Sequence, residues 1–139
     1  MDTLRNFVEN DLFARHLHID MLSYGNGSAQ ARMTLSAEHL NSAGTAHGGA
    51  IFSLADAVFS AASNSHGTLA LAINVSISFF KAARSGTLIA DGREVSRNPR
   101  LATYLVEVKD QDGDQIALFQ GTVYRKKDSL AEVLENTGK

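Results

Sequence analysis

Hydrophobic residues recur at two different spacings along this chain, and the change of spacing marks its elements. Between residues 50 and 64 they fall at every third or fourth position, without Pro or Gly, which is typical of a helix. The positions concerned are Ile51, Leu54, Ala55, Val58, Phe59 and Ala62. Because this stretch is apolar on nearly every side, it predicts one long interior helix that stops before Gly67.

Alternation of apolar and polar residues elsewhere predicts about six antiparallel strands. They are expected near residues 19–24, 29–35, 73–80, 88–90, 102–109 and 116–124, with turns at 25–28, Pro99 and Asp112-Gly113. A short helix is expected over 2–12, and residues 126–139 are expected to be a frayed or helical tail. This order predicts an α+β fold, a single domain over 1–139 in which a curved antiparallel sheet wraps around one long central helix.

Composition narrows the classes of function. The net charge of −2 provides no basic excess for nucleic acid, and the absence of cysteine excludes a Cys nucleophile and Cys-ligated zinc. His47, Asp56 and His66 lack the short spacing of a zinc site, so no metal is expected. No signal peptide and no apolar run long enough to span a membrane are visible, so we expect a cytoplasmic protein without membrane contact.

Asp56 is the unusual residue of the predicted interior helix. Aspartate has poor helix propensity, and burial of its charge is costly without a partner. Ser53, Ser60 and Ser63 lie three or four residues from it or from one another, so they form a thin polar seam in which Asp56 is the only charge. A solvent-facing carboxylate is the ordinary explanation, but the apolar surroundings favour a functional one.

A glycine pair stands immediately before this helix, in His47-Gly48-Gly49. Glycine permits close approach of a ligand, and the first amides of a helix are unpaired and electropositive. They suit a carbonyl that develops negative charge during a reaction. Asn41 and His47 add polar groups to the same loop, although a glycine-rich loop and a surface histidine without a ligand are the commoner case.

Four short motifs occur in an order that resembles the hotdog-fold thioesterases, and most of all their PaaI-like (phenylacetate-degradation) branch. They are Asn41, then Ala46-His47-Gly48-Gly49, then Phe52-Ser53-Leu54-Ala55-Asp56, then Asn64-Ser65-His66-Gly67. The resemblance implies an acyl-CoA thioesterase that acts on an acyl or aryl-acyl thioester. No separate cofactor is expected, because coenzyme A is part of the substrate.

The resemblance also implies roles for individual residues. Asp56 would be the general base or nucleophile, the Gly48 amide would polarise the thioester carbonyl, Asn41 would position water or the leaving group, and His47 would support the loop. Candidates for substrate binding are Gly49, Ser60, Phe80, Lys81, Arg84 and Arg100. The basic residues, with Arg97, would form a rim for the phosphates of CoA, although ordinary surface charge explains each one singly.

The family assembles as dimers, often as dimers of dimers, with the active site between subunits. The resemblance therefore implies a homo-oligomer, commonly a homotetramer, in which Asp56 of one subunit meets the His47–Gly49 loop of another. Two other functions stay open at this point. One is a hotdog hydratase or dehydratase that uses His47 and Asp56 to move a proton, and the other is a non-catalytic module that binds acyl-CoA.

Overall fold

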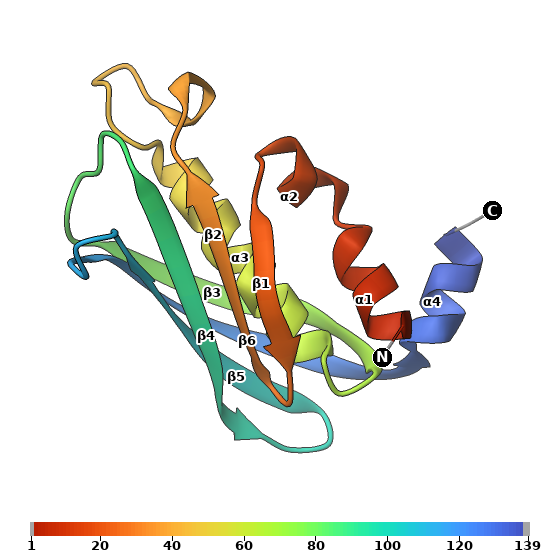
Figure 1. Cartoon of the computed structure of the whole chain (residues 1–139). Coiled ribbons are helices and arrows are strands. Elements are labelled where there is room, and N and C mark those ends of the chain that lie inside the picture. The colour runs from red at the N-terminus through yellow and green to blue at the C-terminus, as the bar shows by residue number, and fades with distance from the viewer. Residues whose placement is uncertain (1, 138–139) are drawn as a thin grey trace.

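The computed structural model describes residues 2–137, and its centre is a curved six-stranded antiparallel sheet that holds helix α3 (Gly48–Asn64) in its concave face (Figure 1). The strands are β1 (Asp20–Gly25), β2 (Ser28–Thr34), β3 (Thr68–Phe79), β4 (Thr87–Arg97), β5 (Leu101–Lys109) and β6 (Gln115–Ser129). Their order across the sheet is β1-β2-β4-β5-β6-β3. The predicted sheet and its central helix are thus confirmed.

Helix α3 is buried on most of its surface, as its apolar pattern predicts. Eleven of its 17 residues are buried. Two glycines of the sheet make room for it. A Cβ on Gly121 of β6 would lie 2.6 Å from the Phe59 ring, and one on Gly92 of β4 would lie 2.5 Å from Val58. The Phe59 ring also packs against Tyr104 and Phe119, with centroids 5.9 and 5.4 Å apart. These contacts fix the helix against the middle of the sheet.

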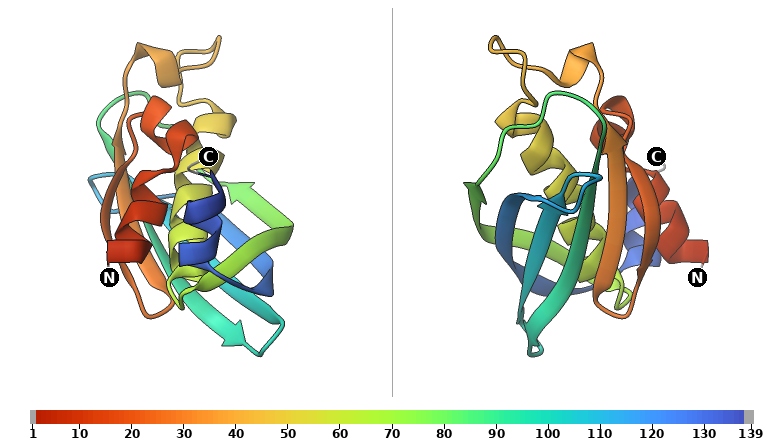
Figure 2. Two further views of the ribbon diagram at one scale, coloured as in Figure 1. Left: turned by 90° about the vertical axis from the view of Figure 1, so that its right-hand side faces the viewer. Right: turned by 60° about the vertical axis from the view of Figure 1, so that its left-hand side comes forward.

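Three short helices at the two ends of the chain flank β1 and α3 (Figure 2). They are α1 (Asp2–Glu9), α2 (Leu12–His16) and α4 (Leu130–Thr137). The prediction of one helix over 2–12 was wrong, because Asp11 starts a new helix: its carboxylate accepts a hydrogen bond from the amide of Ala14 at 3.0 Å.

The C-terminal tail has more regular secondary structure than its polar sequence suggests. Strand β6 continues through the charged residues 125–128 to Ser129, pairing with the start of β3 at Arg125 and Ser129, and α4 follows directly. The tail over 126–139 was predicted to be frayed or helical. Residues 126–129 instead belong to β6, and the helix is found at residues 130–137. Leu130, which is 1% exposed, anchors that helix.

Candidate active site

The partly exposed face of α3 carries its polar residues at intervals of three or four. Gly49, Ser53, Asp56 and Ser60 lie on it, whereas most of the rest of the helix is buried. Ser63 does not belong to this face: it is 2% exposed and donates a hydrogen bond to the carbonyl of Ser60. The predicted polar seam thus exists and ends at Ser60.

The Asp56 carboxylate is partly buried in this face and, among the residues described, no hydrogen-bond partner is found for it. Burial, and then the like charge of Asp11 at the start of α2, raise its pKa above the ordinary value for aspartate. A carboxylate without a partner is a better proton acceptor than one in a salt bridge. Asp56 therefore has the surroundings of a base or nucleophile.

The amide of Gly48 is free at the first position of α3. His47 precedes it as the N-cap, and its Nδ1 accepts a hydrogen bond from the Gly49 amide at 2.8 Å. The amides of Ala50 and Ile51 bond to the His47 carbonyl. Within residues 2–137 the Gly48 N–H has no acceptor, so it is the donor left for a ligand at the positive end of the helix dipole.

An apolar hollow lies directly beside Gly48. It has a volume of about 320 Å³ and is lined by Ala46, Gly48, Ile51, Phe79, Phe80, Lys81 and Ala82. The Phe79 ring would be 3.4 Å from a Cβ on Gly48. Phe80 is 55% exposed at this edge. Gly48 and Phe80, two of the candidate site residues, thus line one space within a single chain.

Asn41 faces its own loop in this structure. Its side-chain oxygen accepts hydrogen bonds from the amides of Ala43 and Thr45, at 3.0 and 3.1 Å, and its nitrogen donates to the Thr45 hydroxyl. The loop is in turn tied to the 80–86 segment, since the Ala46 amide donates to the Ala83 carbonyl. Asn41 thus shapes the approach to Gly48, and its predicted contact with water or the leaving group stays a prediction.

The three basic residues predicted to bind substrate do not gather in one chain. Lys81 lies beside the Gly48 hollow but is already paired with Asp110 and Asp114, at 3.0 and 2.6 Å, and these hydrogen bonds raise its pKa above the usual value. Arg84 lies in the adjoining loop. Arg100 is in the β4–β5 turn, beside the end of β6, which is the opposite end of the sheet. These residues therefore form no single basic rim within one subunit, and their contact with the phosphates of CoA stays a prediction.

A second cavity, of about 490 Å³, adjoins the Asp56 face of α3. On the helix it is lined by Ala57, Ser60 and Ala61, and its other walls come from α1, α2, β1 and α4. Asp11 is one of its lining residues and is also near enough to Asp56 to raise its pKa. Local sequence patterns missed this relation, because Asp11 and Asp56 are 45 positions apart and nothing between them marks the contact.

One histidine, His39, is part of the buried structure. His39 is 1% exposed, and its Nδ1 accepts from the Ser36 amide while its Nε2 contacts the Leu17 carbonyl at 2.7 Å. Across residues 2–137 there is no group of three His, Asp or Glu side chains placed to hold a metal ion. No helix in the same range is long and apolar enough to cross a membrane.

A curved six-stranded antiparallel sheet that holds one long helix in its concave face is the hotdog fold. The family description "Thioesterase superfamily" matches residues 43–117, which include Gly48 and Asp56. The chain therefore belongs to the thioesterase superfamily.

Two related proteins, one of them also as a solved structure, agree with this assignment. A protein of Archaeoglobus fulgidus, provisionally named an esterase, is 50% identical over 118 residues, covering 84% of this chain and 77% of its own. The acyl-coenzyme A thioesterase PaaI of Escherichia coli is 37% identical over 118 residues, covering 84% of each. The structure of the E. coli PaaI protein from the phenylacetic acid degradation operon superposes with a TM-score of 0.88 at 34% identity, covering 92% of this chain and 94% of that one.

Proposed function

We propose that this chain hydrolyses acyl-CoA thioesters to the free acid and CoA, with Asp56 as general base or nucleophile and the Gly48 amide as the donor to the carbonyl oxygen. The observation that carries the proposal is a pair of groups on α3: a partly buried carboxylate without a partner, and an unpaired amide beside an apolar hollow. Thioester hydrolysis needs these two functions at one carbonyl. CoA is part of the substrate, so the reaction needs no separate cofactor.

The two groups of one chain cannot act on the same carbonyl. Gly48 and Asp56 are eight residues apart on one helix, which corresponds to roughly 12 Å along its axis. A base must lie within hydrogen-bond reach of the attacking water, and the oxyanion donor must lie about 3 Å from the oxygen. We therefore place each active site between two subunits, with Gly48 from one and Asp56 from the other.

The free edge of β3 supports this assembly. β3 is the last strand of the sheet, and its unpaired edge would attract another strand. Leu71 and Ile73 on it are 49% and 59% exposed, which is unfavourable unless they are covered. Antiparallel pairing of β3 with its copy would cover both. Further exposed apolar residues on the outer face of the sheet, Ile89, Leu101 and Tyr124, fit a dimer of dimers.

The cavity beside Asp56 is the proposed place for the acyl group. It borders the carboxylate through Ala57 and Ser60, and Phe7, Ile19 and Tyr24 contribute apolar surface to its walls. Its volume of about 490 Å³ is in the range of sites for small organic ligands. Acyl and aryl-acyl groups both fit this description. Phe59, by contrast, is 2% exposed and belongs to the core, so it does not shape the pocket.

In the proposed reaction, the Gly48 amide stabilises the negative charge that develops on the thioester oxygen. Asp56 either accepts a proton from water as the water attacks, or attacks the carbonyl itself to form an anhydride that water then opens. The thiolate of CoA is a good leaving group, so a dedicated general acid is unnecessary. The cytoplasmic location expected from the sequence stays a prediction.

The test is release of free thiol from a panel of short, medium and aryl acyl-CoAs. Wild-type protein should release thiol, and Asp56→Asn should lower kcat by at least about 10² while the oligomer is retained. Asp91→Asn, an exposed aspartate on β4, is the matched control and should retain normal kcat. Hydration of an enoyl-CoA without thiol release would establish the hydratase instead, and tight binding without turnover would establish the non-catalytic module.

A further inference from the structure

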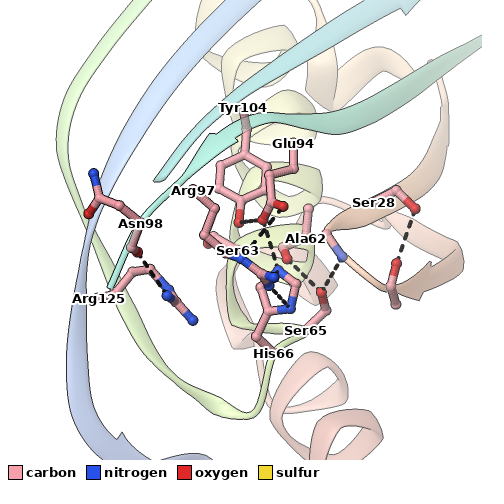
Figure 3. Close-up of polar contacts among 12 residues, drawn as sticks. Ser28, Ala62, Ser63, Ser65, His66, Glu94, Arg97, Asn98, Tyr104 and Arg125 are labelled. Carbon is pink, nitrogen blue, oxygen red and sulfur yellow. Dashed lines mark hydrogen bonds and ion pairs between the residues drawn. The ribbon is translucent and has the colours of Figure 1, made fainter. Parts of the chain in front are cut away.

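Basic side chains line an open hollow of about 810 Å³ at the end of the sheet where α3 finishes. Figure 3 shows three of them, His66, Arg97 and Arg125. The charged lining of the hollow consists of His66 after α3, Arg97 at the end of β4, and the consecutive residues Arg125, Lys126 and Lys127 of β6. We call these five residues and the hollow between them the basic pocket. They come from three segments that are far apart in the sequence.

An irregularity in the sheet brings the lysines together. In the pairing of β3 with β6, Ala70 faces Arg125 and Thr68 faces Ser129, so two steps on β3 correspond to four on β6. The extra residues bulge out of the ladder, which lets Lys126 and Lys127 line one hollow although neighbours in a regular strand point to opposite faces. Arg125 is held by the adjacent turn, because its guanidinium donates to the Asn98 carbonyl at 2.9 Å.

The basic pocket carries a surplus of positive charge. The carboxylate bonded to its side chains is Glu94, which accepts hydrogen bonds from Tyr104 at 2.7 Å and His66 at 2.8 Å and lies 3.8 Å from Arg97. Burial disfavours its charged form, but these bonds and charges hold its pKa below the ordinary value. Glu94 therefore stays ionised and offsets about one of the four permanent charges of Arg97, Arg125, Lys126 and Lys127.

Lys126 and Lys127 are the members of the pocket free to meet a ligand. Among residues 2–137 neither forms an ion pair with the protein, in contrast to Lys81, Arg32 and Lys109, which all do. Clustered cations without counter-ions, on a chain whose net charge is −2, form a local field that attracts anions. Arginine forks and lysine ammonium groups in this arrangement suit phosphate oxygens.

We propose that the basic pocket binds the phosphate groups of the CoA moiety of the substrate; this rests on the proposed function. Within one chain the pocket is separated from Gly48 by the full length of α3, roughly 27 Å between Gly48 and His66. Antiparallel pairing of β3 with its copy would bring the basic pocket close to a Gly48 of the other subunit, because it brings the Thr68 end of one strand beside the Phe79 end of the other. The basic pocket of one subunit then binds the phosphates of a CoA thioester whose carbonyl lies at the Gly48 hollow of the other subunit.

The kinetic test compares two thioesters of the same acid, an acyl-CoA and an acyl-pantetheine, which lacks the phosphates. In K126A/K127A the KM for acyl-CoA should rise about tenfold with kcat nearly unchanged, while both constants for acyl-pantetheine stay at wild-type values. The matched control is R32A/K109A, which removes two positive charges from β2 and β5 and should leave both substrates unaffected. Equal effects of K126A/K127A on the two substrates, or none on either, would overturn the proposal.

Calorimetric titration with adenosine 3′,5′-bisphosphate tests the pocket without turnover. Wild-type protein should bind it with an affinity that falls as salt rises, and K126A/K127A should weaken binding about tenfold. Binding that the double substitution leaves intact would place the phosphates elsewhere. If wild-type protein hydrolyses neither thioester but shows this binding and its loss in the variant, the proposed function fails while the anion site stands.

Discussion

At the scale of single residues, two positions on helix α3, Gly48 and Asp56, have different roles in the proposed site. Gly48 contributes an N–H and no side chain, and its neighbour Gly49 contributes room for the His47 cap: a Cβ on Gly49 would lie 3.0 Å from Nδ1 of His47. Asp56 contributes a charge that its surroundings make unfavourable, since burial and Asp11 both favour the protonated form. Such destabilised groups are typical of active sites, where reactivity outweighs their cost to folding.

The Gly48 amide can be removed without removal of the helix. Gly48 is the first residue of α3, a position where proline is well tolerated, and His47 before it has the extended conformation that proline requires of its predecessor (φ −62°, ψ 135°). Gly48→Pro should lower kcat by roughly 10²–10³ because the oxyanion donor is lost. Gly48→Ala keeps the N–H and adds the same first carbon beside Phe79, so it should retain most activity. Equal losses in steady-state assays of the two variants would count against the role of the amide.

The acidic limb of the pH–rate profile reports on Asp56. The carboxylate is the active form, so activity should fall as pH drops through its raised pKa, above the range of an ordinary aspartate. Asp11→Asn removes the like charge, should lower the pKa of Asp56 and should therefore move the limb to lower pH. Asparagine also keeps the N-cap of α2. Asp20→Asn, in the same cavity, is the control. A limb that does not move in Asp11→Asn would exclude the coupling.

At the scale of elements, local pattern and long-range contact explain different parts of the structure. The spacing of the apolar residues predicted α3 and the sheet, because a helix or strand that buries one face has apolar residues at regular intervals in its own sequence. The start of α2 was missed although Asp11 is a good N-cap, since the apolar pattern continues through it. The continuation of β6 through Arg125–Lys127 was missed because pairing with β3 on either side of this stretch, at Arg125 and at Ser129, holds it in the sheet rather than hydrophobicity.

The same division applies to the site. Asp56 and Gly48 stand out in the sequence because a charge in an apolar helix and a glycine pair before it are local features. The basic pocket and the approach of Asp11 to Asp56 depend on which segments meet in space, and no local pattern records that. The resemblance to a family supplied the roles. The basic rim was inferred from predicted strand ends and turns, and the structure separates Lys81 from Arg100 within one chain.

Gly121 is the close contact between α3 and the sheet that is easiest to test. Gly121→Ala would force its Cβ against the Phe59 ring, and we expect a loss of about 1–3 kcal/mol in the free energy of unfolding, measured by urea denaturation. Phe59→Leu alone should also be destabilising, but the double variant should recover part of the loss because the smaller side chain relieves the clash. Fully additive effects would show that the two residues are not in contact.

At the scale of the whole molecule, the sheet has one edge that is protected and one that is not. β1 lies at one end of the sheet, beside the terminal helices (Figure 2). β3 lies at the other end, and its apolar residues Leu71 and Ile73 are exposed. Pairing through β3 would convert two six-stranded sheets into one continuous sheet. It would also set the two α3 helices side by side, which is the arrangement that the distance between Gly48 and Asp56 requires.

Hybrid oligomers test the shared site directly. Asp56→Asn and Gly48→Pro should each be nearly inactive alone, but co-expression in equal amounts should restore about a quarter of wild-type activity, because half of the dimers are hybrids with one intact site of two. Differently tagged subunits purified in two steps would isolate the hybrid. Hybrids as inactive as the parents would show that both groups act within one subunit.

The cavity beside Asp56 has a consequence for how proteins of this kind diversify. The stretch that matches the family, residues 43–117, holds Gly48 and Asp56, whereas most of the cavity wall comes from the terminal segments around Phe7–Tyr24 and Val133–Thr137. In the proposed site, chemistry and selectivity are thus encoded in separable parts of the chain. Exchange of the ends between relatives would alter the acids released while the catalytic centre is inherited unchanged, so new substrates become accessible without a new active site.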